Sequence, residues 1–396
     1  MDNQHTDQSF VDLLYQRMLA VNAAIAEMEV FEFGYGLETL EPEGGWQSVA
    51  REPCVDIERR IKDSAFFHSI ALRPMVDGKP VMDAQVRALT QTLMAGLVTG
   101  FYTPEWVRQH FTFDVRGFYF FVRTHHYTDE IISRLGGAPY RQFEPKQKLF
   151  EARHAVNYRE FMEANADIDR CFMDLVMTLV DILGRPVIIA IAGQTGAGKT
   201  EITARLTEYF VSAGQRVTTV EIDHFLLDRD YREARGIDSL GMKALHGELF
   251  KACLQEVLLG RSVNTPSYDF ISAMSSHDEM GRRRPGSQEQ VIEPAEIIFM
   301  EGNFPFIDAE VAKLIGIKAM YLTDDDIRLK RKWRRDMDYR KKYERTYFLN
   351  RYFREQFIML EQVYRPQMAH CDLLVDTTAA TLWAIPAIQN KLNGRI

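Results

Sequence analysis

The chain has 396 residues, of which 46% are hydrophobic and 26% charged, and a formal net charge of −8. These are ordinary values for globular proteins, and the length exceeds the usual size of one hydrophobic core, so two domains are expected. The negative charge disfavours a general nucleic-acid binder, and no apolar run approaches the roughly 20 residues that span a bilayer.

The cysteines and the N-terminal residues indicate the compartment. The four cysteines are scattered without a Cys-x-x-Cys pair, which is typical of free thiols in a reducing compartment. The first residues lack the basic start and apolar stretch of a secretory signal. We therefore expect a cytoplasmic protein with no nucleic-acid and no membrane partner, and we leave open whether it forms a homo-oligomer.

Residues 1–180 predict a mixed α+β domain of unknown function. Apolar residues recur at three- and four-residue steps over residues 10–30, which indicates an amphipathic helix. The aromatic run at residues 118–122 has the composition of a buried strand. The adjacent His125 and His126 do not predict a metal site, because neighbouring side chains diverge on a helix or a strand.

Residues 181–396 predict an α/β domain. A helix over residues 167–183 ends at the breaker cluster Gly184-Arg185-Pro186, and we place the domain boundary there. Strands and helices then alternate, with strands expected at residues 187–192, 217–222 and 296–300, and helices at residues 201–210 and 242–259. This alternation indicates a three-layer arrangement with a mainly parallel sheet.

A glycine-rich loop follows the first of these strands. It consists of Gly193, Gln194, Thr195, Gly196, Ala197, Gly198, Lys199 and Thr200, and it fits G-x-x-x-x-G-K-[S/T] without a mismatch. Glycines let the backbone turn tightly and bring N–H groups against phosphate oxygens, while the following helix directs its positive end at the same anion. The loop therefore predicts ATP binding, with Lys199 reaching the β- and γ-phosphates and Thr200 holding Mg²⁺.

Five later segments extend the pattern in order and at plausible spacings. They are residues 217–225, 263–270, 297–302, 326–336 and 366–375. Together with the loop they make residues 186–378 resemble the phosphoribulokinase/uridine kinase family of P-loop kinases. The resemblance implies that Tyr268, Asp269 and Phe270 line the acceptor site and that a basic lid helix closes on the phosphates, with Arg335 and Arg340 as its active cations.

Two carboxylates follow strands of the predicted sheet. Asp223 is a candidate base or orienter for the acceptor hydroxyl, because the carboxyl end of a parallel strand beside the loop is where that hydroxyl meets the γ-phosphate. Glu301 is a candidate Mg²⁺ ligand or substrate contact. Capping roles remain open for both residues, and the basic run of residues 328–342 remains open as a solvated or RNA-binding face.

The segments that would recognise the acceptor depart from the uridine kinase pattern. Ala273 stands where uridine kinases have a histidine, with His277 the nearest alternative, and the matching substrate contacts are Lys332, Lys342 and Asn350 in place of two arginines and a glutamine. Arg and Lys are not interchangeable where a planar guanidinium is used. We therefore expect uridine and cytidine to be poor acceptors.

These expectations define an ATP-dependent kinase that phosphorylates a hydroxyl of a nucleoside-, sugar- or pantothenate-like metabolite. Two alternatives stay open. A toxin-type amino-sugar kinase would share the loop, the aspartate and the basic lid, although such chains generally lack the Tyr-Asp-Phe segment. A nucleotide-binding regulator would bind ATP without turnover, with residues 1–180 contacting a partner.

Overall fold

Contacts within the computed structural model divide the chain into two compact units. The first unit comprises Met1–His125 and Asp336–Leu360, and the second comprises His126–Arg335 and Glu361–Ile396. The structure describes residues 8–144, 165–237, 241–339 and 344–393. The units therefore differ from the predicted division at residue 180, since residues 126–180 join the second unit and residues 336–360 join the first. Independent folding of residues 1–180 and 181–396 stays a prediction.

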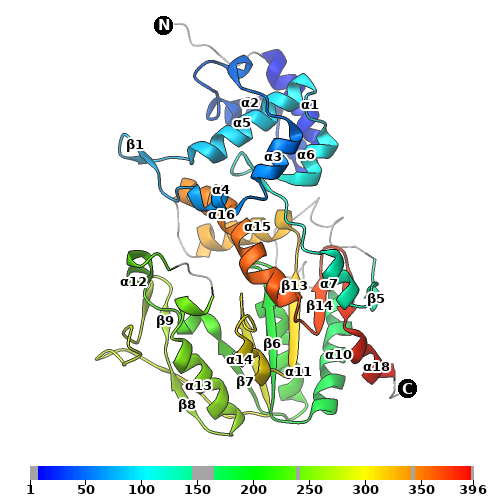
Figure 1. Ribbon diagram of the computed structural model, residues 1–396, viewed down its shortest axis with the longest axis vertical. Coiled ribbons are helices and arrows are strands. Elements are labelled where there is room, and N and C mark those ends of the chain that lie inside the picture. Colours follow the sequence, from blue (N-terminus) through cyan, green and yellow to red (C-terminus); the bar gives the residue numbers. More distant parts are fainter. Residues whose placement is uncertain (1–7, 145–164, 238–240, 340–343, 394–396) are drawn as a thin grey trace. The chain divides into compact units, whose positions relative to one another are not determined.

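A seven-stranded sheet lies at the centre of the second unit (Figure 1), in the order β5-β15-β14-β13-β6-β12-β7. Its strands are β5 (Arg141–Gln142), β6 (Val187–Gly193), β7 (Val217–Glu221), β12 (Ile297–Gly302), β13 (Ile317–Leu322), β14 (Leu373–Asp376) and β15 (Thr381–Ala384). The strands from β14 to β7 pair in parallel, whereas β15 and β5 pair antiparallel at one edge. The expected mainly parallel sheet is confirmed.

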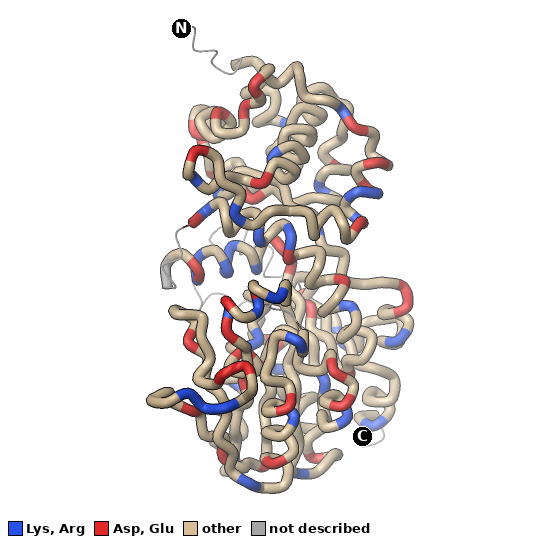
Figure 2. The backbone as a smooth tube through the Cα atoms, turned by 60° about the vertical axis from the view of Figure 1, so that its left-hand side comes forward, with Lys and Arg blue, Asp and Glu red and all other residues tan. Residues whose placement is uncertain are grey.

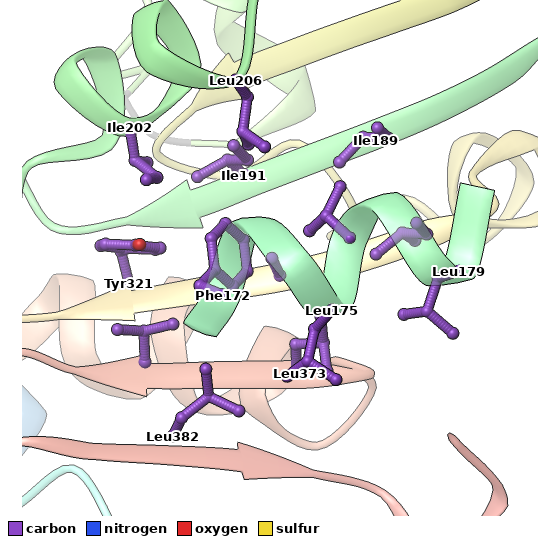
Figure 3. Packing of buried hydrophobic residues seen from close by; sticks show 14 of the residues in the cluster. Phe172, Leu175, Leu179, Ile189, Ile191, Ile202, Leu206, Tyr321, Leu373 and Leu382 are labelled. Atoms are coloured by element: carbon purple, nitrogen blue, oxygen red, sulfur yellow. The ribbon is translucent and has the colours of Figure 1, made fainter. Parts of the chain in front are cut away.

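Helix α10 (Ala166–Leu183) covers one face of this sheet together with α11 (Lys199–Ser212) and α18 (Pro386–Asn393). All residues of β6 are buried, as expected for a parallel strand covered on both faces. Figure 3 shows Phe172 and Leu175 of α10 lying against the strands that carry Ile191 and Leu373. A cut at residue 180 would therefore remove a helix whose apolar face belongs to the core of the second unit.

The other elements of the second unit surround this core. Figure 1 shows α13 on one side of the sheet and α10 with α18 on the other. The helices are α7 (Asp129–Arg134), η3 (Ile222–Phe225), α12 (Arg229–Ala234), η4 (Met242–Ala244), α13 (Gly247–Leu258), α14 (Ala309–Leu314), α15 (Asp325–Arg334), the π-helical η6 (Leu360–Tyr364) and α17 (Arg365–Met368). Two small antiparallel sheets pair β8 (Val263–Thr265) with β11 (Gln290–Ile292) and β9 (Tyr268–Asp269) with β10 (Met274–Ser275).

The first unit is mainly helical. Its helices are α1 (Gln8–Val21), η1 (Ala23–Glu27), α2 (Val30–Glu38), η2 (Trp46–Ser48), α3 (Cys54–Arg60), α4 (Ser64–Ser69), α5 (Ala84–Thr99), α6 (Pro104–His110) and α16 (Arg345–Met359), with the π-helical η5 (Arg335–Tyr339) at the border between the units. Hairpins pair β1 (Met75–Val76) with β2 (Lys79–Pro80) and β3 (Phe111–Asp114) with β4 (Tyr119–Val122). The predicted helix from residue 10 is confirmed over its first half as α1, and the predicted aromatic strand is confirmed as β4.

Helix α16 supplies part of the apolar core of the first unit although it lies far along the chain. Phe353 is fully buried and lies 5.7 Å from the ring of Phe67, and Phe357 stacks on the same ring at 4.2 Å. Aromatic rings of this size contribute much of the apolar area buried in a small core.

Within the described ranges, no helix combines the length and the apolar composition needed to cross a membrane.

Candidate active site

The predicted phosphate loop connects β6 to α11, and close backbone approach explains two of its glycines. A Cβ added at Gly193 would lie 2.3 Å from the carbonyl oxygen of Tyr321. One added at Gly196 would lie 2.7 Å from the carbonyl oxygen of Arg328, and the φ of Gly196 is +87°. Only glycine meets both demands at these positions. The loop thus fits closely against its neighbours, and α11 begins at Lys199 with free backbone N–H groups that can bind an anion.

Lys199 is the buried cation of the loop, with 8% of its surface exposed. Its Nζ donates to the backbone oxygen of Gln194 at 3.1 Å and to Oδ1 of Asn303 at 3.5 Å. Burial lowers the pKa of Lys199, whereas the charges of Glu301 and Asp223 act in the opposite direction. Sequence reasoning missed Asn303, and the available signal was its place directly after Glu301 and Gly302, which follow the strand expected at residues 296–300.

Thr200 and Glu301, the two residues expected at Mg²⁺, lie side by side. The Thr200 hydroxyl lies 3.0 and 3.1 Å from the two carboxylate oxygens of Glu301. Desolvation raises the pKa of Glu301, and Lys199 and the Thr200 hydrogen bond offset part of that effect. Hydroxyl and carboxylate oxygens are ligands that Mg²⁺ accepts, so this pair fits the ion.

Asp223 and Arg335 approach the same group of residues. Asp223 lies in η3, directly after β7, and it is half-buried. Its charge raises the pKa of both Lys199 and Glu301, while the charge of Arg335 lowers that of Lys199. The structure therefore brings together the predicted base Asp223, the phosphate-loop lysine Lys199, the predicted metal ligand Glu301 and the lid arginine Arg335. Arg340 and Lys342 lie outside the described residues.

Helix α15 packs directly against the phosphate loop. Arg331 donates from Nη1 to the backbone oxygen of Gly196 at 2.9 Å, and the Thr323 hydroxyl donates to that of Ala197 at 3.2 Å. Arg328, which lies between them on the chain, forms a buried ion pair with Asp325 at 2.6 Å. The start of the predicted basic lid thus supports the loop, a role that sequence reasoning did not assign. Lys332 lies on the same helix and is half-buried.

Tyr268 and Phe270 form an aromatic pair beside Asp223. Their ring centroids lie 5.2 Å apart, and the Phe270 ring lies 6.0 Å from that of His224. The backbone N–H of Tyr268 donates to Nδ1 of His224 at 3.2 Å, which ties this pair to the residue that follows Asp223. The expected aromatic wall is therefore close to the candidate base.

Asp269 behaves differently from its two neighbours. Its carboxylate accepts the hydroxyl of Ser272 at 2.6 Å and the backbone N–H of Ile271 at 2.9 Å, and the hydrogen bond from Ser272 holds the pKa of Asp269 below its usual range. These are the bonds of an aspartate that stabilises its own turn. The contacts of Asp269 support a structural role in the hairpin rather than the predicted substrate contact.

Asn350 also departs from its predicted role. It belongs to the first unit and is fully buried. Its amide group donates to the backbone oxygens of Leu72 and Val81 at 3.3 and 3.2 Å and accepts the backbone N–H of Asp83 at 2.8 Å. These bonds use the carboxamide to hold the backbone of the first unit, which does not support a substrate contact. Alignment by residue order could not show this, because the partners lie more than 260 residues away.

The contacts of His277 do not support a role in place of the missing uridine kinase histidine. Its Nε2 lies 3.3 Å from the carboxylate of Glu289 and its Nδ1 lies 2.9 Å from the hydroxyl of Ser276. The ring is buried, with both nitrogens engaged inside its own loop. Ala273 is buried as well, and its carbonyl accepts the backbone N–H of Arg229.

Comparison with known proteins places this site in a family. The model of the phosphoribulokinase/uridine kinase family matches residues 188–383. A uridine kinase of Brevibacillus brevis is 31% identical over 162 residues, which are 40% of this chain and 70% of that protein. A uridine kinase of Halobacterium salinarum is 27% identical over 207 residues, which are 52% of this chain and 85% of that protein. A solved structure titled as a possible uridine kinase from Bacillus stearothermophilus has 16% identity and a TM-score of 0.36, covering 51% of this chain and 97% of that one.

The site is thus that of a P-loop kinase with a hydroxyl acceptor, as expected. The chain belongs to the phosphoribulokinase/uridine kinase family, which confirms the resemblance seen in its sequence. The family model begins in β6, just before the phosphate loop, and ends in β15.

Proposed function

We propose that the protein transfers the γ-phosphoryl group of ATP to a hydroxyl group of a small metabolite. The acceptor oxygen forms a bond to the γ-phosphorus, the bond from that phosphorus to the bridging oxygen breaks, and ADP leaves. The observation that carries this proposal is the convergence of Lys199, Thr200, Glu301 and Asp223 around one loop.

Each of these groups has a role that follows from its chemistry. Lys199 and Arg335 neutralise charge that develops on the transferred phosphoryl group, where a desolvated cation acts most strongly. Asp223 accepts the hydroxyl proton of the acceptor or orients that hydroxyl. Thr200 and Glu301 would hold Mg²⁺, which when bound neutralises the β- and γ-phosphate oxygens.

The acceptor differs from uridine in this proposal. Recognition of a pyrimidine edge needs buried, directional hydrogen bonds, and their loss removes discrimination. Ala273 offers no polar side chain, His277 is engaged with Glu289, and Asn350 holds the backbone of the first unit. Tyr268 and Phe270 provide an aromatic wall, which supports a ring-shaped or sugar-like acceptor.

ADP formation measured with a panel of hydroxylated metabolites tests the proposal. We expect turnover that depends on the acceptor, a loss of roughly 100-fold or more in Lys199→Ala, and a lower kcat with nearly unchanged ATP affinity in Asp223→Asn. Exposed Lys313→Ala serves as the control and should keep wild-type rates. Tight ATP binding without turnover would favour the regulator, and activity confined to activated amino sugars would favour the toxin-type kinase.

A further inference from the structure

Three cationic side chains are buried within the parts of the chain that the structure describes. They are Lys199, Arg232 and Arg328, with 8%, 7% and 6% of their surfaces exposed. A buried charge is costly unless an opposite charge accompanies it. Arg328 meets this requirement through its ion pair with Asp325.

Lys199 and Arg232 form no ion pair with a described residue. For neither of them does any carboxylate of the described residues lie within the 4.0 Å of an ion pair. For Lys199 the explanation follows from the phosphate loop, because the counter-anion is the nucleotide phosphate. The same observation at Arg232 calls for a second anion.

The contacts of Arg232 leave most of its guanidinium group unused. Its Nε donates to the backbone oxygen of Leu227 at 3.0 Å, and its Nη2 donates to the hydroxyl of Tyr268 at 3.4 Å, which is long for a hydrogen bond. A guanidinium group has five N–H donors and stays protonated at physiological pH. The remaining donors have no acceptor among the described residues.

The acidic residue four positions before Arg232 is already neutralised. Asp228, which precedes α12, accepts both Nη1 and Nη2 of Arg284, at 3.1 and 2.6 Å. Its carboxylate also accepts the backbone N–H of Ser275 at 2.7 Å. Arg284 therefore has a carboxylate partner in this part of the fold. Arg232, which is more deeply buried, has no carboxylate partner among the described residues. Figure 2 shows acidic and basic positions interspersed along the chain, so a general excess of basic residues does not explain the difference.

The location of Arg232 indicates that the phosphoryl acceptor, rather than the nucleotide, would supply the anion that pairs with it. Tyr268, which the Nη2 group contacts, is part of the aromatic wall beside Asp223 and His224. This is the side on which the proposed function places the acceptor, whereas the nucleotide phosphates belong at Lys199. The inference therefore rests on the proposed function for its choice of ligand.

We propose that the phosphoryl acceptor carries an acidic group, a carboxylate or a phosphate, which Arg232 binds. A guanidinium group can hold either of these with two parallel hydrogen bonds, and Arg232 has donors available for that geometry. Tyr268 orients the guanidinium group by its hydroxyl. A neutral nucleoside would leave the buried charge of Arg232 unpaired, which gives a second reason for poor use of uridine and cytidine.

Pairs of acceptors that differ only in the acidic group test this directly. Glycerol is compared with D-glycerate, pantothenol with pantothenate, and ribose with ribose 5-phosphate, and ADP formation is measured for each. We expect at least one acidic member to exceed its neutral partner about 10-fold or more in kcat/KM, and Arg232→Met to remove about 10- to 100-fold of that advantage. Which pair responds distinguishes a carboxylate from a phosphate. Arg232→Lys should recover part of the advantage, because it restores the charge without the planar fork.

Binding measured without turnover separates this inference from the proposed function. The protein saturated with MgADP, which occupies the phosphate loop, is titrated with D-glycerate, pantothenate and ribose 5-phosphate while Tm is recorded. We expect one of these anions to raise Tm in the wild type and in Arg235→Gln, an exposed control on the same segment, but not in Arg232→Met. Equal kcat/KM for neutral and acidic partners, or no stabilisation that depends on Arg232, overturns the inference and leaves the kinase assignment standing. Stabilisation that depends on Arg232 without ADP formation from any acceptor supports an anion site at Arg232 and refutes the proposed function.

Discussion

Gly196→Ala tests the contact between the phosphate loop and α15. Gly196 has a φ of +87°, and an added Cβ would lie 2.7 Å from the carbonyl oxygen of Arg328. The left-handed conformation alone costs an alanine about 1–2 kcal/mol. The clash is with backbone, which cannot rotate away, so either the loop or α15 must move and the bond from Arg331 to the Gly196 oxygen is lost.

Gly214→Ala is the matched control. Gly214 has a φ of +77° and nothing within 4 Å of the added Cβ, so its substitution carries the conformational cost without the clash. In urea unfolding we expect Gly214→Ala to lose about 1–2 kcal/mol and Gly196→Ala to lose more. By titration calorimetry we expect ATP affinity to fall at least about 10-fold in Gly196→Ala alone, since about 1.4 kcal/mol corresponds to tenfold. Equal stability and equal ATP affinity in the two variants would refute the argument that α15 supports the loop.

Two further predictions concern the cores of the units. Phe353→Ala should lower the free energy of unfolding by about 3–5 kcal/mol, because the ring is fully buried. The control is Phe31→Ala, which should change the free energy of unfolding by less than about 0.5 kcal/mol because Phe31 is 73% exposed. Similar losses in both variants would contradict the placement of α16 in the first unit. Burial raises the pKa of Asp169 to about 6, although Arg205 and Tyr321 act in the opposite direction. The stability that protonated Asp169 contributes is therefore complete below about pH 4 and is lost as the pH rises through 6. We expect Asp169→Asn to flatten unfolding free energy against pH in this window, by roughly 3 kcal/mol at most, and an unchanged profile would show that Asp169 does not titrate there.

The positions in the fold that could be predicted from the sequence are those set by local geometry. The phosphate loop needs its glycines, lysine and threonine at fixed spacing, because the strand, turn and helix that form it are consecutive in the chain. The mainly parallel sheet could also be predicted from the sequence, because the fully buried strand β6 is a continuous apolar run. Asp223 and Glu301 were located by the same reasoning, as acidic residues at the ends of predicted strands.

The parts that the sequence predicted poorly depend on contacts between distant segments. Asn350 was assigned by its order in the lid region, but its amide hydrogen bonds are made with residues 72–83. The boundary at residue 180 followed from a local breaker cluster, whereas the apolar face of α10 packs on strands that come later in the chain. A helix pattern shows that a face is buried without showing which element buries it.

The basic run in the lid region illustrates the same limit for charge. Density of Arg and Lys along a helix does not tell which of them point toward the protein. The pair of Asp325 with Arg328 has an i, i+3 spacing and was detectable from sequence, but the donation from Arg331 to Gly196 spans 135 residues. Only the folded chain separates cations that support the loop from those available to a ligand.

This distinction bears on how one fold serves different acceptors. The residues proposed to bind the phosphates, Lys199, Thr200 and Glu301, belong to α11 and β12, whereas Arg232 and Tyr268 belong to α12 and β9, which follow β7 and α13. Because the two sets lie on separate segments, a change at Arg232 can alter the charge of the preferred acceptor while leaving the phosphate-binding loop intact. The backbone N–H of Tyr268 donates to Nδ1 of His224, next to Asp223, which keeps the acceptor wall close to the candidate base whatever the acceptor is. We therefore expect that substitutions at Arg232 change the preferred charge of the acceptor without abolishing phosphoryl transfer in this chain.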